Sequence, residues 1–194
     1  MPQSSRYRTA RAGTRPPPKP LGPARLEELA LAYAARFAVS AAKLADYLRR
    51  KLRERGWEGE GEPPVEAIVM RFVAAGYVDD AAYARAKSTS MLRRGLGMRR
   101  VSQAWQEAGI SQNDRADAVA TEATQRHAAL ALARKRRIGP FGAPVADRAA
   151  REKQIGAMLR AGHPLDSARE LVNAASVEAA EQWAAQADGD ESCD

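Results

Sequence analysis

The sequence predicts an all-α protein built from three consecutive helical units. Three glycines, Gly56, Gly109 and Gly162, each follow a helical segment and precede an apolar or aromatic residue, and their spacing is 53 residues both times. A glycine just past a helix adopts the left-handed conformation without the penalty of a Cβ atom. Self-similarity at such a period is typical of arrays of helical modules. The many Ala, Leu, Arg and Glu residues favour helix, and no run of alternating β-branched residues indicates a strand.

The first unit is expected over residues 23–77, after a leader at 1–22 that is rich in proline and arginine and that we expect to be disordered. Ser40 can cap a second helix that ends at Gly56, and a third helix ends at Gly76. Each helix has an apolar stripe at helical spacing. The three stripes are Leu26, Leu29, Tyr33 and Phe37; Leu44, Tyr47, Leu48 and Leu52; and Val65, Ile68, Val69, Phe72 and Val73.

The second unit, residues 78–121, contains three pairs of residues that begin or interrupt helices. They are the capping pair Asp79 and Asp80, the turn glycines Gly95 and Gly97, and the capping-box pair Ser111 and Asp114. These signals predict a helix to about Arg94, a second helix with Val101 and Trp105 on its apolar face, and a polar, alanine-rich third helix.

The third unit is expected over residues 122–175, where Gly139, Pro140 and Gly142 end its first helix. A second helix leads to Gly162, and a short third helix follows it. The remaining residues, 176–194, carry six acidic side chains and no basic one, counting Glu178, Glu181, Asp188, Asp190, Glu191 and Asp194. We expect them to form an acidic C-terminal tail.

Composition argues against enzymatic, metal-binding and membrane functions. The sequence has no phosphate-binding loop, no zinc motif and no apolar run of the roughly 20 residues that a membrane-spanning helix needs. Its two histidines, His127 and His163, have no metal-ligand neighbours in sequence, and the single cysteine, Cys193, cannot form an internal disulfide. We therefore expect a cytoplasmic protein that is not an enzyme and uses no metal or cofactor.

Three clusters of basic residues are the candidate binding sites in a chain of net charge +7. The first lies on one helix and includes Arg49, Arg50 and Arg53; the second comprises Arg85, Lys87, Arg93, Arg94, Arg99 and Arg100; the third comprises Arg134, Lys135, Arg136 and Arg137. Lysine and arginine at helix C-termini are also favoured by the helix dipole, so the first and third clusters are equally well explained as solvated faces. The second cluster has no acid between Ala81 and Gln106, which favours a binding role.

Within the second cluster, we expect Arg93, Arg94, Arg99 and Arg100 to face a partner. They surround the turn glycines Gly95 and Gly97, whose missing side chains let a partner approach the backbone closely.

Other conspicuous residues have simpler structural interpretations. The pair Asp79 and Asp80 precedes a helix, so capping is a better interpretation than metal binding. His163 follows a helix-ending glycine and is expected to pack, as are Trp57, Tyr77 and Trp105, rather than to stack on nucleic-acid bases.

Four stretches of the chain together resemble the RecX family of bacterial regulators of the RecA recombinase. They are residues 48–57, 72–84, 94–101 and 106–110, and they include the strings Gly-Tyr-Val-Asp-Asp and Arg-Gly-Leu-Gly. The similarity extends over about residues 24–175, and in the third unit it rests on the repeat pattern and on residues 136–142. The leader and the acidic tail lie outside it.

The resemblance implies tandem three-helix modules in an elongated, curved array. It also implies a regulator of DNA repair, recombination and the SOS response that binds in the groove of the RecA–single-stranded-DNA filament. There it would inhibit strand exchange and ATP hydrolysis, without catalytic residues or cofactor. Two alternatives stay open: a direct single- or double-stranded DNA-binding protein with 97–108 as a recognition helix, and a helical protein-interaction scaffold. We expect a monomer.

Overall fold

The structure is a computed structural model that describes residues 19–143 and 147–190. Over these residues the chain is all helical, and the one pairing of strand type is an isolated bridge between Leu21 and Trp57. The α-helices are α1 (Pro23–Arg36), α2 (Ala41–Arg55), α3 (Val65–Ala74), α4 (Asp80–Arg93), α5 (Met98–Glu107), α6 (Gln112–Arg115), α7 (Glu122–Arg136), α8 (Arg148–Ala161), α9 (Leu165–Asn173) and α10 (Val177–Asp190). Two short 3₁₀ helices are η1 (Ala116–Ala118) and η2 (Gly139–Phe141).

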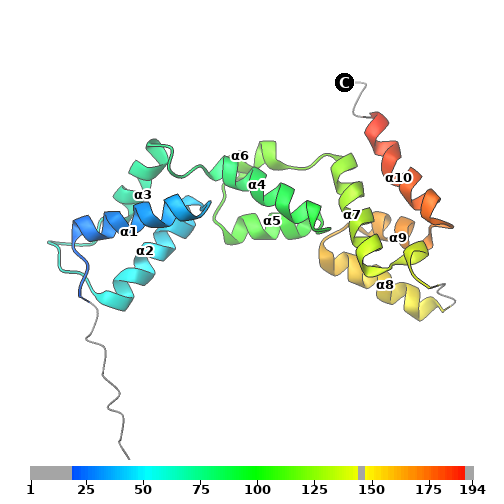
Figure 1. The fold of residues 1–194 in the computed structure, drawn as a ribbon, viewed down its shortest axis with the longest axis horizontal. Coiled ribbons are helices and arrows are strands. Elements are labelled where there is room, and N and C mark those ends of the chain that lie inside the picture. The colour runs from blue at the N-terminus through cyan, green and yellow to red at the C-terminus, as the bar shows by residue number, and fades with distance from the viewer. Residues whose placement is uncertain (1–18, 144–146, 191–194) are drawn as a thin grey trace, which may run out of the picture.

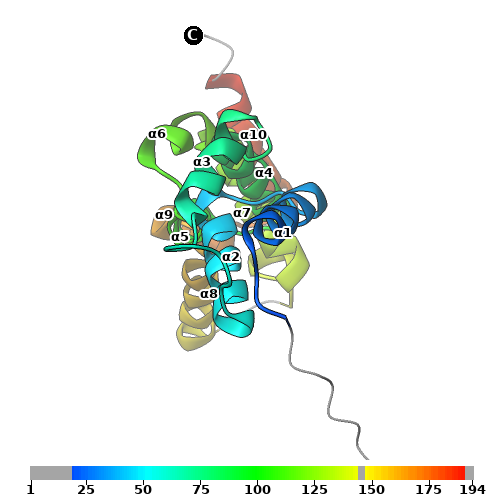
Figure 2. The ribbon, with the colours of Figure 1, turned by 90° about the vertical axis from the view of Figure 1, so that its left-hand side faces the viewer.

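The helices pack around three successive hydrophobic cores, which lie in a row along an elongated molecule (Figure 1). Viewed from its end, the molecule shows the three groups of helices one behind another (Figure 2). The first core belongs to α1–α3, the second to α4 and α5 with η1 and Ala128 of α7, and the third to α7–α10. The expected all-α fold is confirmed.

The described residues start within the expected leader. Leu21 is fully buried in the first core, and its backbone pairs with Gly56 and Glu58 on both sides of the bridge. The described structure of the first unit therefore begins at Lys19, and residues 1–18 lie outside the described part of the chain.

The third core extends beyond residue 175, where we expected the acidic tail to begin. Helix α10 runs beside α7 and buries Ala180 and Ala184 in this core. The acidic side chains of this segment suggest a solvated tail, but its alanines recur every three to four residues and form a buried face. The third core consequently has four helices.

Most helix ends follow the sequence signals. The side chains of Ser40, Asp79 and Thr121 accept hydrogen bonds from the first turns of α2, α4 and α7. Ser111 caps as predicted, but the third helix of the second unit is reduced to the single turn of α6 followed by η1.

The three equally spaced glycines have two kinds of surroundings. At Gly109 and Gly162 the next residue, Ile110 or His163, donates its N–H to a carbonyl five residues earlier, as in the usual glycine-ended helix. At Gly56 the φ angle is also positive, at 84°, but ψ is 172°, and the Gly56 carbonyl accepts from the N–H of Leu21. The helix endings of the second and third units thus resemble each other more than either resembles that of the first unit.

Polar side chains join the first core to the second. The Ser40 hydroxyl donates to the Ala108 carbonyl at 2.6 Å and is fully buried. The N–H of Ala41 donates to Asp80 Oδ1 at 2.8 Å, and Lys43 Nζ donates to the Tyr83 hydroxyl at 2.7 Å. We call this contact the first joint.

Backbone groups join the second core to the third. The N–H of Gly97 donates to the Ala161 carbonyl at 2.9 Å, and the N–H of Arg99 donates to the Gly162 carbonyl at 3.3 Å. The buried His163 donates through Nε2 to the Gly95 carbonyl at 2.9 Å. Leu96 packs against both cores, so this second joint is a continuous part of the interior.

Candidate partner-binding surface

The second basic cluster lies on α4, on α5 and on the turn between them. Its six cations are Arg85, Lys87, Arg93, Arg94, Arg99 and Arg100. Among the residues that the structure describes, none of the six forms an ion pair. Their positive charge is therefore not neutralised at close range, which is the property that an anionic partner requires.

Hydrogen bonds divide these arginines into two groups. Arg99 donates from Nη2 to the Leu159 carbonyl at 2.6 Å and so binds the end of α8, in the third unit. Arg94 donates to the Ser90 carbonyl of its own helix, and Arg100 donates to Gln103. Arg93 lines a groove beside α4. Arg99 thus contributes to the second joint, whereas the exposed guanidinium groups of Arg93, Arg94 and Arg100 make at most local contacts.

The turn at residues 95–97 does not offer its backbone to a partner, contrary to our expectation. Gly95 and Gly97 are both buried, and a Cβ atom on Gly97 would lie 2.3 Å from the carbonyl oxygen of Gly162. The close approach that we predicted exists, but the chain's own third unit makes it. Sequence spacing could not distinguish an internal contact from an external one.

In contrast, acidic neighbours offset much of the first basic cluster. Arg49 pairs with Glu66 of α3 at 2.5 Å and with Asp46 at 3.3 Å, and its hydrogen bond holds the pKa of Glu66 below the ordinary value. Arg50 lies 3.7 Å from Glu54, which also pairs with Lys51. Only Asp46 and Glu54 were visible as neighbours in the sequence, because Glu66 is brought close by the packing of α3 on α2.

Arg53 completes this cluster. It is exposed, and its charge contributes to the lowered pKa of Glu54, after the larger effect of the hydrogen bond from Lys51. These pairings favour the interpretation of the first cluster as a solvated face.

The third basic cluster is divided at the end of α7. Arg134 pairs with Glu181 of α10, and its guanidinium lies 5.8 Å from the centre of the Phe141 ring. Lys135 and Arg136 are exposed on the last turn, where the helix dipole favours cations. Arg137 ends the helix in the left-handed conformation, with φ of 54°. Glu181 of the acidic helix α10 thus neutralises part of the cluster.

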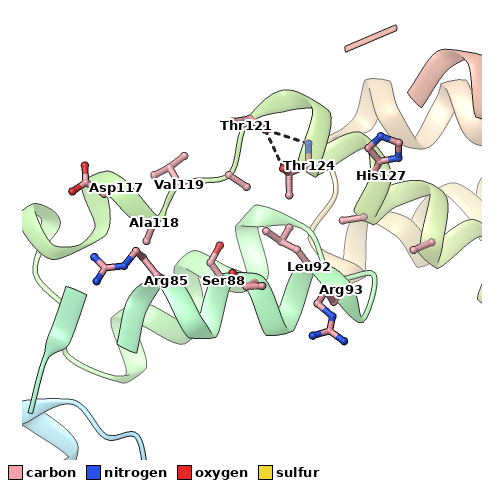
Figure 3. A pocket seen from close by; sticks show the side chains of 14 residues that line it. Arg85, Ser88, Leu92, Arg93, Asp117, Ala118, Val119, Thr121, Thr124 and His127 are labelled. Atoms are coloured by element: carbon pink, nitrogen blue, oxygen red, sulfur yellow. Dashed lines mark hydrogen bonds between the residues drawn. The ribbon is translucent and has the colours of Figure 1, made fainter. Parts of the chain in front are cut away.

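A groove of about 580 Å³ lies between α4 and the segment that leads from η1 into α7 (Figure 3). Its floor and walls include Leu92, Ala118, Ala128 and Ala131, and Val119 at its edge is 58% exposed. Cations of the second basic cluster stand on its α4 side, at Arg85 and Arg93. The groove could not be seen in the sequence, because its two walls, residues 85–93 and 117–131, are separate segments that meet only after folding.

The acidic pair before α4 and the aromatic residues near helix ends have structural roles. Asp79 caps α4, but Asp80 binds the first unit through Ala41. Trp105 is buried and donates to the Ala84 carbonyl at 3.1 Å, and Trp57 packs on the first core. Tyr77 is 60% exposed, but its ring packs on the core residue Phe72, with 5.5 Å between the ring centres, as expected of a residue that follows a helix-ending glycine.

His163 is buried, as expected of a packing residue. Burial lowers its pKa from the usual value of 6.5, and the hydrogen bond to the Gly95 carbonyl opposes that shift.

Among the described residues, no group of histidine, cysteine or carboxylate side chains is arranged to hold a metal ion. In the same part of the chain, no helix has the length and apolar character needed to cross a membrane.

The fold therefore defines an all-helical protein with three consecutive cores and an uncompensated cationic surface on the middle one. No family model matches the sequence. The chain is 31% identical over 165 residues to the regulatory protein RecX of Myxococcus xanthus, a match that covers 80% of this chain and 88% of that protein. The chain belongs to the RecX family.

The fold is also that of a solved relative. The crystal structure of RecX from Lactobacillus salivarius superposes with a TM-score of 0.60 and 19% identity, covering 77% of this chain and 93% of that one.

Proposed function

We propose that this chain regulates the RecA recombinase by binding in the groove of the RecA–single-stranded-DNA filament, where it inhibits strand exchange and ATP hydrolysis. The observation that carries the proposal is the uncompensated cationic surface of α4 and α5 at the middle of an elongated protein of the RecX family. A row of small units can follow a long repeated groove and make many modest contacts that add up by avidity. The division into modules at residues 23–77, 78–121 and 122–175 is part of this proposal, with α10 added to the last module.

Direct reading of duplex DNA by α5 fits the structure less well. A recognition helix presents its N-terminal residues to base edges. Here the start of α5 is covered by the end of α8, since Gly97 and Arg99 donate to Ala161 and Gly162 and the Arg99 guanidinium binds Leu159. This geometry favours contacts by the outer cations over insertion of the helix into a groove of DNA.

The test compares the uncompensated cluster with the neutralised one. One variant carries Arg85→Ala, Arg93→Ala and Arg94→Ala, and the matched control carries Arg49→Ala, Arg50→Ala and Arg53→Ala. Both remove three exposed cations, and each single change should alter the free energy of unfolding by less than about 0.5 kcal/mol. We expect the first variant to lose inhibition of RecA-catalysed strand exchange and ATP hydrolysis, and the control to retain it.

Full inhibition by the first variant would overturn the role given to its cations and make them a solvated face, with the function unchanged. A second result would overturn the function itself. Retention of the wild-type chain by bare duplex and not by the filament, at physiological salt, would instead support a direct DNA-binding protein, with an affinity that falls steeply as salt rises. We also propose that the chain acts as a monomer, which sedimentation of the free protein tests.

A further inference from the structure

The groove beside α4 combines an apolar floor with a cation at each end. Arg85 and Arg93 come from the same helix, eight residues apart. Figure 3 shows their side chains near opposite ends of the groove, with the Arg93 guanidinium on the side of α4 away from the η1–α7 segment. Eight residues of α-helix separate them by about 12 Å along the axis. Between them the groove is lined by Leu92 and by alanine methyl groups, together with the side chains of Ser88, Thr89, Thr121, Thr124 and His127. Its volume of about 580 Å³ is in the range of pockets that hold a ligand.

We propose that this groove binds an apolar segment of a protein partner that carries a carboxylate at each end, about 12 Å apart. The carboxylates would pair with Arg85 and Arg93, and one or two aliphatic side chains would cover Val119 and the alanines between them. This inference rests on the proposed function in one respect, which is that RecA is taken as the partner.

Charge complementarity supports a protein partner of this kind. Neither Arg85 nor Arg93 belongs to an ion pair with any other described residue, so both guanidinium groups are available for a carboxylate. The surrounding stretch from Ala81 to Gln106 contains no acid. The one acidic residue of the lining is Asp117, at the rim on the η1 side.

The lining suits a peptide better than it suits a nucleic acid. Single-stranded nucleic acids bind through aromatic rings on which their bases stack, next to cations for the phosphates. None of the described residues that line the groove is Phe, Tyr or Trp. Aliphatic side chains of a peptide gain free energy when they cover Val119, which is 58% exposed.

The groove also bridges two cores. Ala128 belongs to the second core, and its neighbour on α7, Ala129, belongs to the third. A ligand that contacts both α4 and α7 would therefore bind only while the second joint keeps these helices together.

The experiment uses the full-length chain and overlapping 15-residue peptides that cover the RecA of the same organism. Binding is measured by fluorescence anisotropy for the wild type, for Arg85→Glu/Arg93→Glu and for the control Arg50→Glu/Arg53→Glu. The control makes the same change of charge on α2, outside the groove lining. We expect the tightest peptides to carry an aliphatic side chain between two carboxylates, and the groove variant to weaken them about tenfold or more. The control should bind within about twofold of the wild type.

The decisive test exchanges the charges of the peptide and the groove. Lysine in place of the two carboxylates of the peptide should abolish binding to the wild type and restore it to Arg85→Glu/Arg93→Glu. Absence of any such peptide among the binders, equal loss in both variants, or loss of binding to a single-stranded oligonucleotide alone would overturn the proposal. Strand-exchange inhibition by the wild-type chain is measured in parallel. If it inhibits while no peptide binds, the groove assignment fails and the proposed function stands; if peptides bind without inhibition, the reverse holds.

Discussion

The two joints of this molecule connect similar cores in different ways. At the first joint, three polar side chains, Ser40, Lys43 and Asp80, reach across a boundary that the described hydrophobic clusters do not cross. At the second joint, backbone meets backbone at Gly97 and Gly162, and apolar packing continues through Leu96. Hydrophobic packing couples the folding of neighbouring units more strongly than exchangeable polar contacts do. The second and third units should therefore unfold together, and the first should open separately.

The largest expected effect comes from adding one methyl group at the second joint. In Gly97→Ala the new Cβ atom would lie 2.3 Å from the Gly162 carbonyl oxygen and 2.6 Å from the His163 nitrogen. Both are backbone atoms that cannot move aside, so the free energy of unfolding should fall by about 3 kcal/mol. Chemical denaturation measures the loss, and separate transitions for the second and third units would show that the joint has opened.

The matched control for this substitution is Gly156→Ala on α8. There the nearest atom is Arg160 Nη1 at 3.3 Å, at the end of a flexible side chain, and alanine is the better helix former by about 1 kcal/mol. Stability should stay the same or rise. A Gly97→Ala protein as stable as the wild type would show that the second joint is no tighter than the first.

At the first joint, the expected effect of Ser40→Ala is smaller. The substitution removes the hydroxyl that binds the Ala108 carbonyl and also accepts from the N–H of Lys43, so it leaves a buried carbonyl without this partner. A loss of about 1–2 kcal/mol is expected. Hydrogen exchange should show faster opening of α1–α3, with α7–α9 unchanged. Uniform acceleration through the whole chain would mean that the first joint is as cooperative as the second.

The exposed cap Ser111 supplies the comparison for Ser40. It caps α6 within the second unit and joins no other core. Ser111→Ala should therefore cost less than Ser40→Ala and leave the exchange of α1–α3 unaffected.

The contrast between the joints also shows which features of the fold can be predicted from sequence patterns. Stripes and caps placed most helices, because helix periodicity and the capping role of Ser40 or Asp79 are properties of neighbouring residues. The contacts at the joints could not be predicted, because a glycine such as Gly97 looks the same in sequence whether its own chain or a partner covers it. Likewise, the neutralisation of Arg49 by Glu66 and of Arg134 by Glu181 depends on helices that meet only after folding. The basic stretch of α4 and α5 was identified as a candidate because it lacks acids, and the structure adds none by ion pairing.

Acidification should weaken the second joint through His163. Because burial lowers the pKa of this histidine in the folded state, folding favours the neutral ring. Its contribution to stability is present above pH 6.5, the usual pKa, and is lost as the pH falls toward the lower folded-state pKa. Thermal melting of wild type and His163→Gln between pH 7.5 and 5 tests this. The slope of the wild type should flatten in the variant, and parallel curves would assign the pH dependence to other groups.

The smallest expected effect has the opposite sign and belongs to the first joint. Burial raises the pKa of Asp80, against the hydrogen bond from the Ala41 N–H, and the nearby Asp114 and Asp79 raise it further. A carboxyl with a raised folded-state pKa stabilises the fold below its ordinary pKa near 3.8, and this stability is lost as the pH rises through the folded value. At neutral pH the charge of Asp80 thus slightly destabilises the first joint.

Asn at this position keeps an oxygen that accepts from the Ala41 N–H and carries no charge. Asp80→Asn should therefore slow the hydrogen exchange of α2 at pH 7 and have little effect at pH 4, where the wild-type group is closer to neutral. Faster exchange at pH 7 would mean that attraction of the Asp80 carboxylate to the start of α4 exceeds the cost of its burial. The first joint would then gain stability from charge, and acid would weaken both joints alike.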